Sequence, residues 1–282
     1  MVLHKKWFLS LLLMLALILA ACSGGDEGSE GAEEGASNTA EATESEGVAE
    51  PELEAEPTPT EEALDLSNAK TLDEIADINS FRLRINIQAE GDAFATQDGA
   101  PQLGSGINIE GAFVKEPAAQ HIVMALGDDD QGLGNLEFIQ VDNKGYANFT
   151  GEWIEAPVEQ APSIEDLAFM TPADLADGLH EFERVGDTET LNGRDTVHLH
   201  ADKETFAKLN TGDEQIALDQ AEEVEIDLWF DQADGFIVKM QILAQGKGLN
   251  EEDAEATGRV EMTLEYYDFN ENIVIEAPET SG

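Results

Sequence analysis

Apolar and polar residues alternate with a period of two along much of the chain after residue 80. Successive side chains of a β-strand point to opposite faces of a sheet, so this alternation predicts strands with one apolar and one polar face. Such one-sided strands are typical of antiparallel sheets. The clearest runs cover residues 81–87, 107–113, 224–230, 238–242 and 260–266.

Turn residues such as Asn192-Gly193 separate several of these runs, as expected between the strands of hairpins. Weaker runs between the turns bring the expected number of strands to about eleven. These additional strands are expected at residues 119–126, 134–141, 145–149, 180–189, 194–201 and 272–276.

Short helical segments interrupt the strands. Each has a capping residue or a proline at its start and apolar residues along its length. The apolar face of the sheet must be covered, so we expect these helices to lie across it. They are predicted at residues 71–78, 163–169, 171–175 and 202–209. The fold class that follows is mainly β (α+β), in one domain over residues 70–282.

The N-terminus has the pattern of a secretory signal. His4, Lys5 and Lys6 precede an apolar run of fourteen residues, 7–20, which is shorter than the roughly 20 residues that span a bilayer. The residues that follow, Leu19-Ala20-Ala21-Cys22, resemble the lipobox of bacterial lipoproteins. That resemblance implies that residues 1–21 are a signal peptide, and that the Cys22 thiol carries a diacylglycerol after cleavage.

The alternative is an ordinary cleaved signal followed by an incidental cysteine. Cys22 is the single cysteine of the chain, so it cannot form an internal disulfide, and lipidation explains its presence in an exported protein. Residues 22–69 are rich in Glu, Gly, Ser, Ala, Thr and Pro and have no aromatic residue. We expect this acidic segment to be a disordered tether between the lipid and the domain.

The formal net charge of −47 excludes one class of function. Nucleic-acid binding requires basic residues that replace phosphate counterions, and this chain has no basic stripe. Two explanations of the acidity stay open: adaptation to a salty environment, in which repulsion is screened, or simple solubility at the cell envelope.

Several local features, taken in order, resemble the LolA-like superfamily and within it the LppX/LprG-type bacterial lipoproteins. They lie at residues 77–82, 183–199, 227–240 and 266–278. The resemblance implies an antiparallel half-barrel of about eleven strands that wraps short helices and holds lipid or acyl chains in a hydrophobic cavity. It also implies a protein with no catalytic residues and no cofactor.

The inward-facing positions of the predicted strands are the candidates for lining that cavity. Packing in an ordinary dry core is the alternative for each of them, and Met240 and Met262 are the better ligand candidates because thioethers adapt to varied apolar shapes. The candidates are Phe81, Leu83, Ile85, Ile109, Phe113, Leu228, Phe230, Met240, Met262 and Leu264.

Two other groups of residues are candidates for binding a metal ion. His198 and His200 lie two apart on a predicted strand and could share a Zn²⁺ ion, but the alternation favours a solvated outer face. The acidic run 128–132 lacks the ligand positions of an EF-hand and is interpreted as a surface turn. No catalytic motif is found, so we expect no enzyme, no cofactor and no metal.

These features favour a lipid-anchored protein on the extracytoplasmic face of a cell membrane, most simply a monomer. Our leading hypothesis is a lipoprotein that binds or carries lipid or acyl chains. A sensory envelope module similar to RseB-type proteins is one alternative, although the second domain usual in such proteins is not visible. A structural surface lipoprotein with a filled core is the other.

Overall fold

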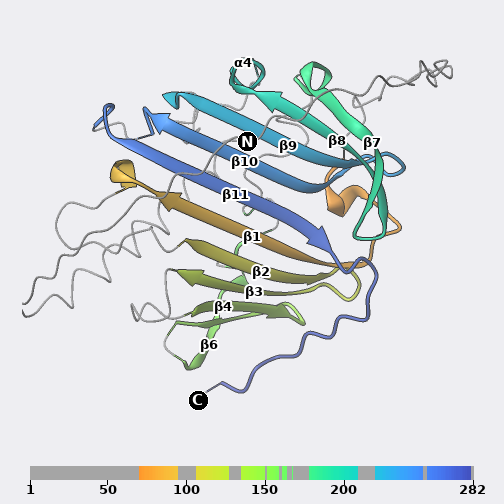
Figure 1. Ribbon diagram of the computed structural model, residues 1–282. Coiled ribbons are helices and arrows are strands. Elements are labelled where there is room, and N and C mark those ends of the chain that lie inside the picture. Colours follow the sequence, from red (N-terminus) through yellow and green to blue (C-terminus); the bar gives the residue numbers. More distant parts are fainter. Residues whose placement is uncertain are drawn as a thin grey trace, which may run out of the picture. The chain divides into compact units, whose positions relative to one another are not determined.

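A computed structural model gives the fold (Figure 1). The structure describes residues 70–94, 106–126, 135–149, 151–158, 161–163, 167, 178–208, 220–249 and 253–280. Every described residue belongs to one compact unit, which lies within Leu64–Gly282. The predicted signal peptide, Cys22 and the predicted tether lie outside the described residues. Within the described residues, no helix is long and apolar enough to cross a membrane.

Eleven strands form one antiparallel sheet, which confirms the predicted fold class and strand number. The first six strands are β1 (Ser80–Glu90), β2 (Ile107–Val114), β3 (Ala119–Leu126), β4 (Asn135–Val141), β5 (Lys144–Asn148) and β6 (Trp153–Ala156). The other five are β7 (Glu183–Leu191), β8 (Arg194–Asp202), β9 (Glu223–Asp231), β10 (Ile237–Lys247) and β11 (Thr257–Tyr267).

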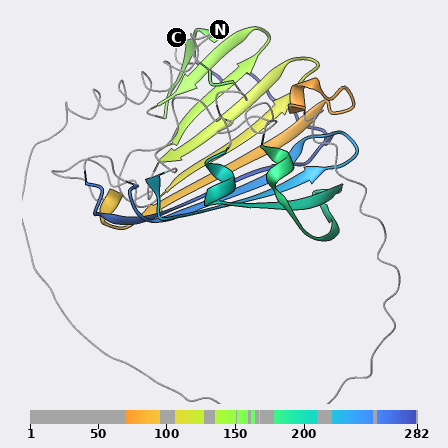
Figure 2. The same cartoon turned by 90° about the horizontal axis from the view of Figure 1, so that it is seen from above.

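The strand order follows the chain except at one place. It runs β6-β5-β4-β3-β2-β1-β11-β10-β9-β8-β7, so the first and last strands of the chain pair in the middle of the sheet. Each half of the sheet is thus a meander, in which strands that follow one another in the chain are paired. The pairing of β1 with β11 joins the two halves. The sheet does not close, and its two edges are β6 and β7. Figure 2 shows that it is strongly twisted and curved.

One predicted strand is wrong and one observed strand was not predicted. Residues 272–276 form no strand, because both neighbours of β1 are already taken by β2 and β11 and no edge is free beside them. Left-handed φ angles at Asp268 (54°) and Asn270 (60°) turn the chain away after β11. The eleventh strand is instead β6, a four-residue edge strand.

The described helices are shorter than predicted. Residues 71–78 contain only a 3₁₀ turn, η2 (Leu72–Glu74), in which the Glu74 carboxylate accepts a hydrogen bond from the Thr71 amide at 3.0 Å. The turn ends at Ile75, whose backbone is extended, and the Lys115 ammonium donates to the carbonyls of Leu72 (2.7 Å) and Ile75 (2.8 Å). Two further 3₁₀ turns are η3 (Asp92–Phe94) and η7 (Leu179–Glu181).

The predicted helix at 202–209 is confirmed in its first turn as α4 (Lys203–Phe206), which lies against β8 and β9. Asp202 caps it by accepting a hydrogen bond from the Thr205 amide at 2.9 Å, and backbone hydrogen bonds lower the pKa of the Asp202 carboxyl. The predicted helix at 171–175 and the acidic run 128–132 lie outside the described residues. Of the predicted helix at 163–169, only residues 163 and 167 are described, and Leu167 is helical and buried.

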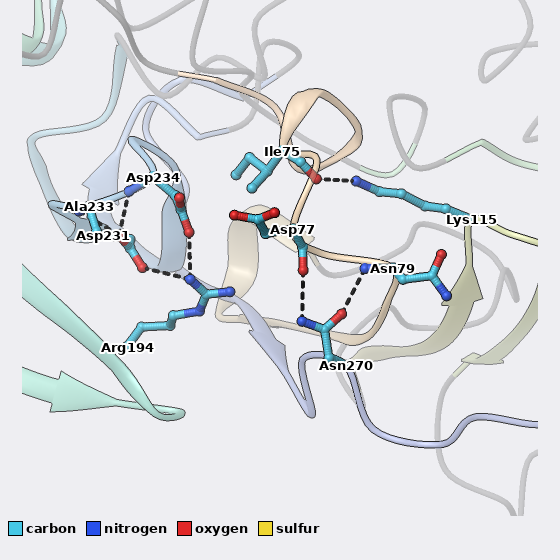
Figure 3. A network of polar contacts seen from close by, with 9 residues as sticks. All are labelled: Ile75, Asp77, Asn79, Lys115, Arg194, Asp231, Ala233, Asp234 and Asn270. Atoms are coloured by element: carbon cyan, nitrogen blue, oxygen red, sulfur yellow. Dashed lines mark hydrogen bonds and ion pairs between the residues drawn. The ribbon is translucent and has the colours of Figure 1, made fainter.

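A polar network at one end of the sheet fixes the start of the domain (Figure 3). Asn270 donates to the Asp77 carbonyl (2.8 Å) and accepts from the Asn79 amide (2.7 Å), which ties the segment before β1 to the segment after β11. Nearby, Arg194 on β8 pairs with Asp231 and Asp234 of the β9–β10 turn at 3.5 and 2.6 Å. The two ends of the domain are thus fastened to each other and to a hairpin.

Candidate functional site

The ten candidate cavity residues all lie on one face of the sheet, which we call the inner face. Where a strand holds several candidates, they are two or four positions apart, and the strand registers place the candidates of neighbouring strands side by side. Ile85 illustrates this, since it is paired with Ile109 of β2 on one side and with Leu264 of β11 on the other.

One row of the inner face crosses eight strands without a polar side chain. Each member is the register partner of the next, and all are at most 8% exposed. In order from β4 to β8 the row is Leu136, Met124, Ile109, Ile85, Leu264, Met240, Leu228 and Leu199. The inner face is therefore one continuous apolar surface rather than separate clusters.

The ten candidates are almost completely buried. Their exposed fractions range from 0% for Phe81, Leu83, Ile85 and Leu228 to 4% for Ile109 and Met262. Full burial of such a side chain contributes about 1.5–3 kcal/mol to folding, so the inner face is first of all the hydrophobic core. An acyl chain could reach these residues only if the chain segments that cover them moved.

Aromatic side chains gather around Gly111 on the inner face. The ring of Phe81 stacks on that of Phe113 with centroids 5.1 Å apart, and meets Tyr266 edge-on at 5.8 Å. A Cβ atom on residue 111 would lie only 2.5 Å from the Phe113 ring, so glycine leaves the space that this ring occupies. The strand pattern predicted the position of Gly111 but not this packing.

Sequence reasoning missed several inner-face residues, although the signal was present. Ile122, Met124, Phe138, Val197 and Leu199 are buried and belong to strands that were predicted at nearly the observed positions. Val197 and Leu199 alternate with His198 and His200, whereas the runs around Ile122, Met124 and Phe138 alternate less regularly than β1 or β9.

A pocket of about 440 Å³ opens at another place, where β1, β10 and β11 end together. Charged and small residues line it, among them Glu90, Glu222, Glu223 and Arg259. None of the ten candidates contributes to it. Carboxylates at this density are unsuited to an acyl chain, so this pocket is separate from the predicted ligand face.

The structure places His198 and His200 on the outer, polar face of the sheet. Both imidazoles contact one oxygen of Asp227 on the neighbouring strand, at 2.7 and 3.1 Å. His198 also stacks on Trp229, with ring centroids 4.4 Å apart, and the Lys239 ammonium lies 4.3 Å from the centre of the same indole. Both sides of Trp229 are thus occupied, and the imidazoles are held by a carboxylate. Among the described residues, no group of His, Cys, Asp and Glu is arranged to hold a metal ion.

Comparisons with known proteins find likenesses among solved structures. No protein-family model matches the chain, and no curated protein matches it. Among solved structures, the chain is similar to LprF from Mycobacterium bovis, with 14% sequence identity and a TM-score of 0.33, over 71% of this chain and 90% of that one. A TM-score this low supports no argument about fold or function. The fold is defined by the eleven strands themselves.

Proposed function

We propose that this protein is a lipid-anchored lipoprotein of the cell envelope whose domain binds acyl chains on its inner face. The observation that supports this proposal is the apolar row that crosses eight strands of an open, curved sheet. Each methylene transferred from water to such a surface contributes about 0.8 kcal/mol, so a twelve-carbon chain gains roughly 9–10 kcal/mol before ordering costs. No catalytic group is needed for this role.

Because the inner face is closed in this structure, capture requires a conformational step. The apparent affinity is then reduced by the fraction of molecules in which the cover is displaced. Release of a bound acyl chain requires the same displacement of the cover. The resulting moderate affinity suits a protein that passes its ligand on. The proposed lipid at Cys22 would keep this exchange at a membrane surface.

A structural surface lipoprotein without a ligand is the second candidate. The exposed fractions of 0–4% at the ten candidate positions favour it, because a filled core leaves no space for a guest. The two functions differ in whether the inner face ever opens to an acyl chain.

Native mass spectrometry of residues 23–282, purified from two bacterial hosts, separates the two. Co-purified phospholipid or fatty acid is expected for the acyl-chain binder, and a bare mass from both hosts, with no uptake of added fatty acid, would leave the structural role. Met262→Gln should weaken uptake several-fold, since it puts an amide on the inner face. Thr263→Gln is the matched control, because Thr263 is the next residue of β11 and lies on the outer face.

A further inference from the structure

The apolar inner face reaches solvent at one edge of the sheet. A second row of register partners runs from the centre of the sheet to the edge strand β6, and its exposed fraction changes abruptly at the end. Leu83 and Ile122 are 0% exposed and Ala147 is 1% exposed, whereas Ile154 on β6 is 50% exposed. The full row is Leu83, Gly111, Ile122, Phe138, Ala147 and Ile154.

Phe149 extends this exposed end. Its ring packs edge-on against Phe138, with centroids 5.7 Å apart, so it lies on the same face as Ile154. Phe149 is 47% exposed, although it is a large aromatic residue directly after β5. Phe149 and Ile154 are therefore exposed apolar residues on the same face at this edge, and we call the pair the β5–β6 lip. Contiguous exposed apolar side chains on a soluble domain mark contact surfaces.

Two charged residues of the same hairpin, Lys144 and Glu155, point the other way. Lys144 and Glu155 pair at 3.7 Å, and Glu155 follows Ile154 on β6, so its side chain is on the outer face. Trp153, which precedes Ile154, also lies on the outer face and is half-buried. This edge of the sheet thus has a polar outer face and an apolar inner face, and the apolar face is continuous with the core.

We propose that the β5–β6 lip docks on the surface of a neutral bilayer, with Phe149 and Ile154 dipping into the boundary between headgroups and acyl chains. The proposal rests on the part of the proposed function that places the domain at a membrane, and it does not require a ligand on the inner face. A zwitterionic surface is the occupant that fits, because a chain of net charge −47 is repelled by anionic lipids.

The length of the tether makes a weak contact effective. Forty-eight positions separate Cys22 from Lys70, where the described domain begins. A flexible chain of that length has a root-mean-square span of about 40 Å. A domain held so close to the bilayer binds it as an intramolecular partner, so two apolar side chains suffice where they would fail from free solution.

The test uses the full-length chain in phosphatidylcholine vesicles that contain a doxyl-labelled lipid. Trp7→Phe and Trp229→Phe leave Trp153 as the single tryptophan, one residue from Ile154. The vesicles are expected to quench Trp153 by at least half, and adding Phe149→Ser and Ile154→Ser should remove most of that quenching. Val185→Ser and Val274→Ser are the controls, since these residues are exposed elsewhere at 42% and 70% and their variants should be quenched normally.

Absent quenching of Trp153, or quenching that survives the two lip substitutions, would overturn the proposal. So would a Trp153 emission shift that depends on protein concentration in detergent without vesicles, because it would identify a second copy as the occupant. Intact mass of the same sample reports whether Cys22 carries lipid. If it does not, the anchor has failed, while the apolar segment 7–20 still holds the chain on the vesicle and docking is still measured.

Discussion

At the scale of single residues, the structure gives specific reasons for residue types that the sequence pattern treats as interchangeable. Gly111 occupies an inner-face position where the alternation allows any apolar residue, but the Phe113 ring fills the space of its missing side chain. Asn270 follows the last strand as an ordinary turn residue, yet its side-chain amide bridges Asp77 and Asn79 across 191 or more positions of the sequence. Neither role is visible before the strands are paired.

Gly111→Ala should destabilise the domain by about 1–3 kcal/mol, the usual effect of overpacking a filled core. The new Cβ would lie 2.5 Å from Phe113, so the ring must move away from Phe81. Urea unfolding monitored by circular dichroism measures the change. Phe113→Leu in the same chain should recover part of the loss, and strictly additive effects of the two substitutions would contradict the proposed clash.

At the scale of elements, tertiary contacts decided the lengths that local sequence preferences left open. The capping residues Thr71 and Glu74 predicted a helix, but the backbone is already extended at Ile75, and Lys115 donates to the Leu72 and Ile75 carbonyls. Residues 272–276 alternate like a strand, and Ile273 and Ile275 are indeed half-buried. They find no free partner because β1 is paired on both sides. The local pattern thus favoured a helix in one segment and a strand in the other, but the hydrogen bonding of both depends on distant parts of the chain.

Lys115→Met should loosen the η2 turn without unfolding the sheet. The substitution keeps most of the aliphatic side chain and removes the ammonium that holds the Leu72 and Ile75 carbonyls at 2.7 and 2.8 Å. Amide hydrogen exchange at Ile75 and Ile78 is expected to become at least tenfold faster, while exchange in β10 stays unchanged. Lys239→Met on the outer face is the control, and equal acceleration in both variants would argue against a local role for Lys115.

At the scale of the whole molecule, repulsion between the negative charges opposes the stability that the apolar core provides. The chain has a net charge of −47, and 46 of its 61 acidic residues lie in residues 71–282, so like charges repel one another within the compact domain. The apolar inner face opposes that repulsion, and because β1 pairs with β11, the core spans both halves of the chain. The first and last strands of the described residues therefore meet in the centre of the sheet and join its two halves.

Salt should therefore stabilise the protein. The Debye length falls from about 30 Å at 0.01 M to about 3 Å at 1 M, so raising NaCl across this range screens the repulsion between carboxylates. We expect the midpoint of thermal unfolding to rise by several degrees, most of it below 0.3 M. Sucrose at matched osmolality is the control for general exclusion effects, and a midpoint independent of NaCl would show that the surface charges are too far apart to interact.

The sequence by itself determined the features that depend only on residues close together in the chain, such as strand positions and the direction of each side chain. A period of two predicted ten of the eleven strands and placed all ten candidate residues on one face, because side-chain direction is a local property of an extended chain. Composition likewise determined the acidity, which disfavours nucleic-acid binding.

Only the tertiary structure decided which strands are neighbours, where the sheet ends and what its faces meet. The pairing of β1 with β11, the choice of β6 over 272–276 as the eleventh strand, and the emergence of the apolar face at Phe149 and Ile154 all depend on contacts between distant residues. Such contacts are set by competition for a limited number of strand edges and buried positions, and this competition involves the whole chain at once.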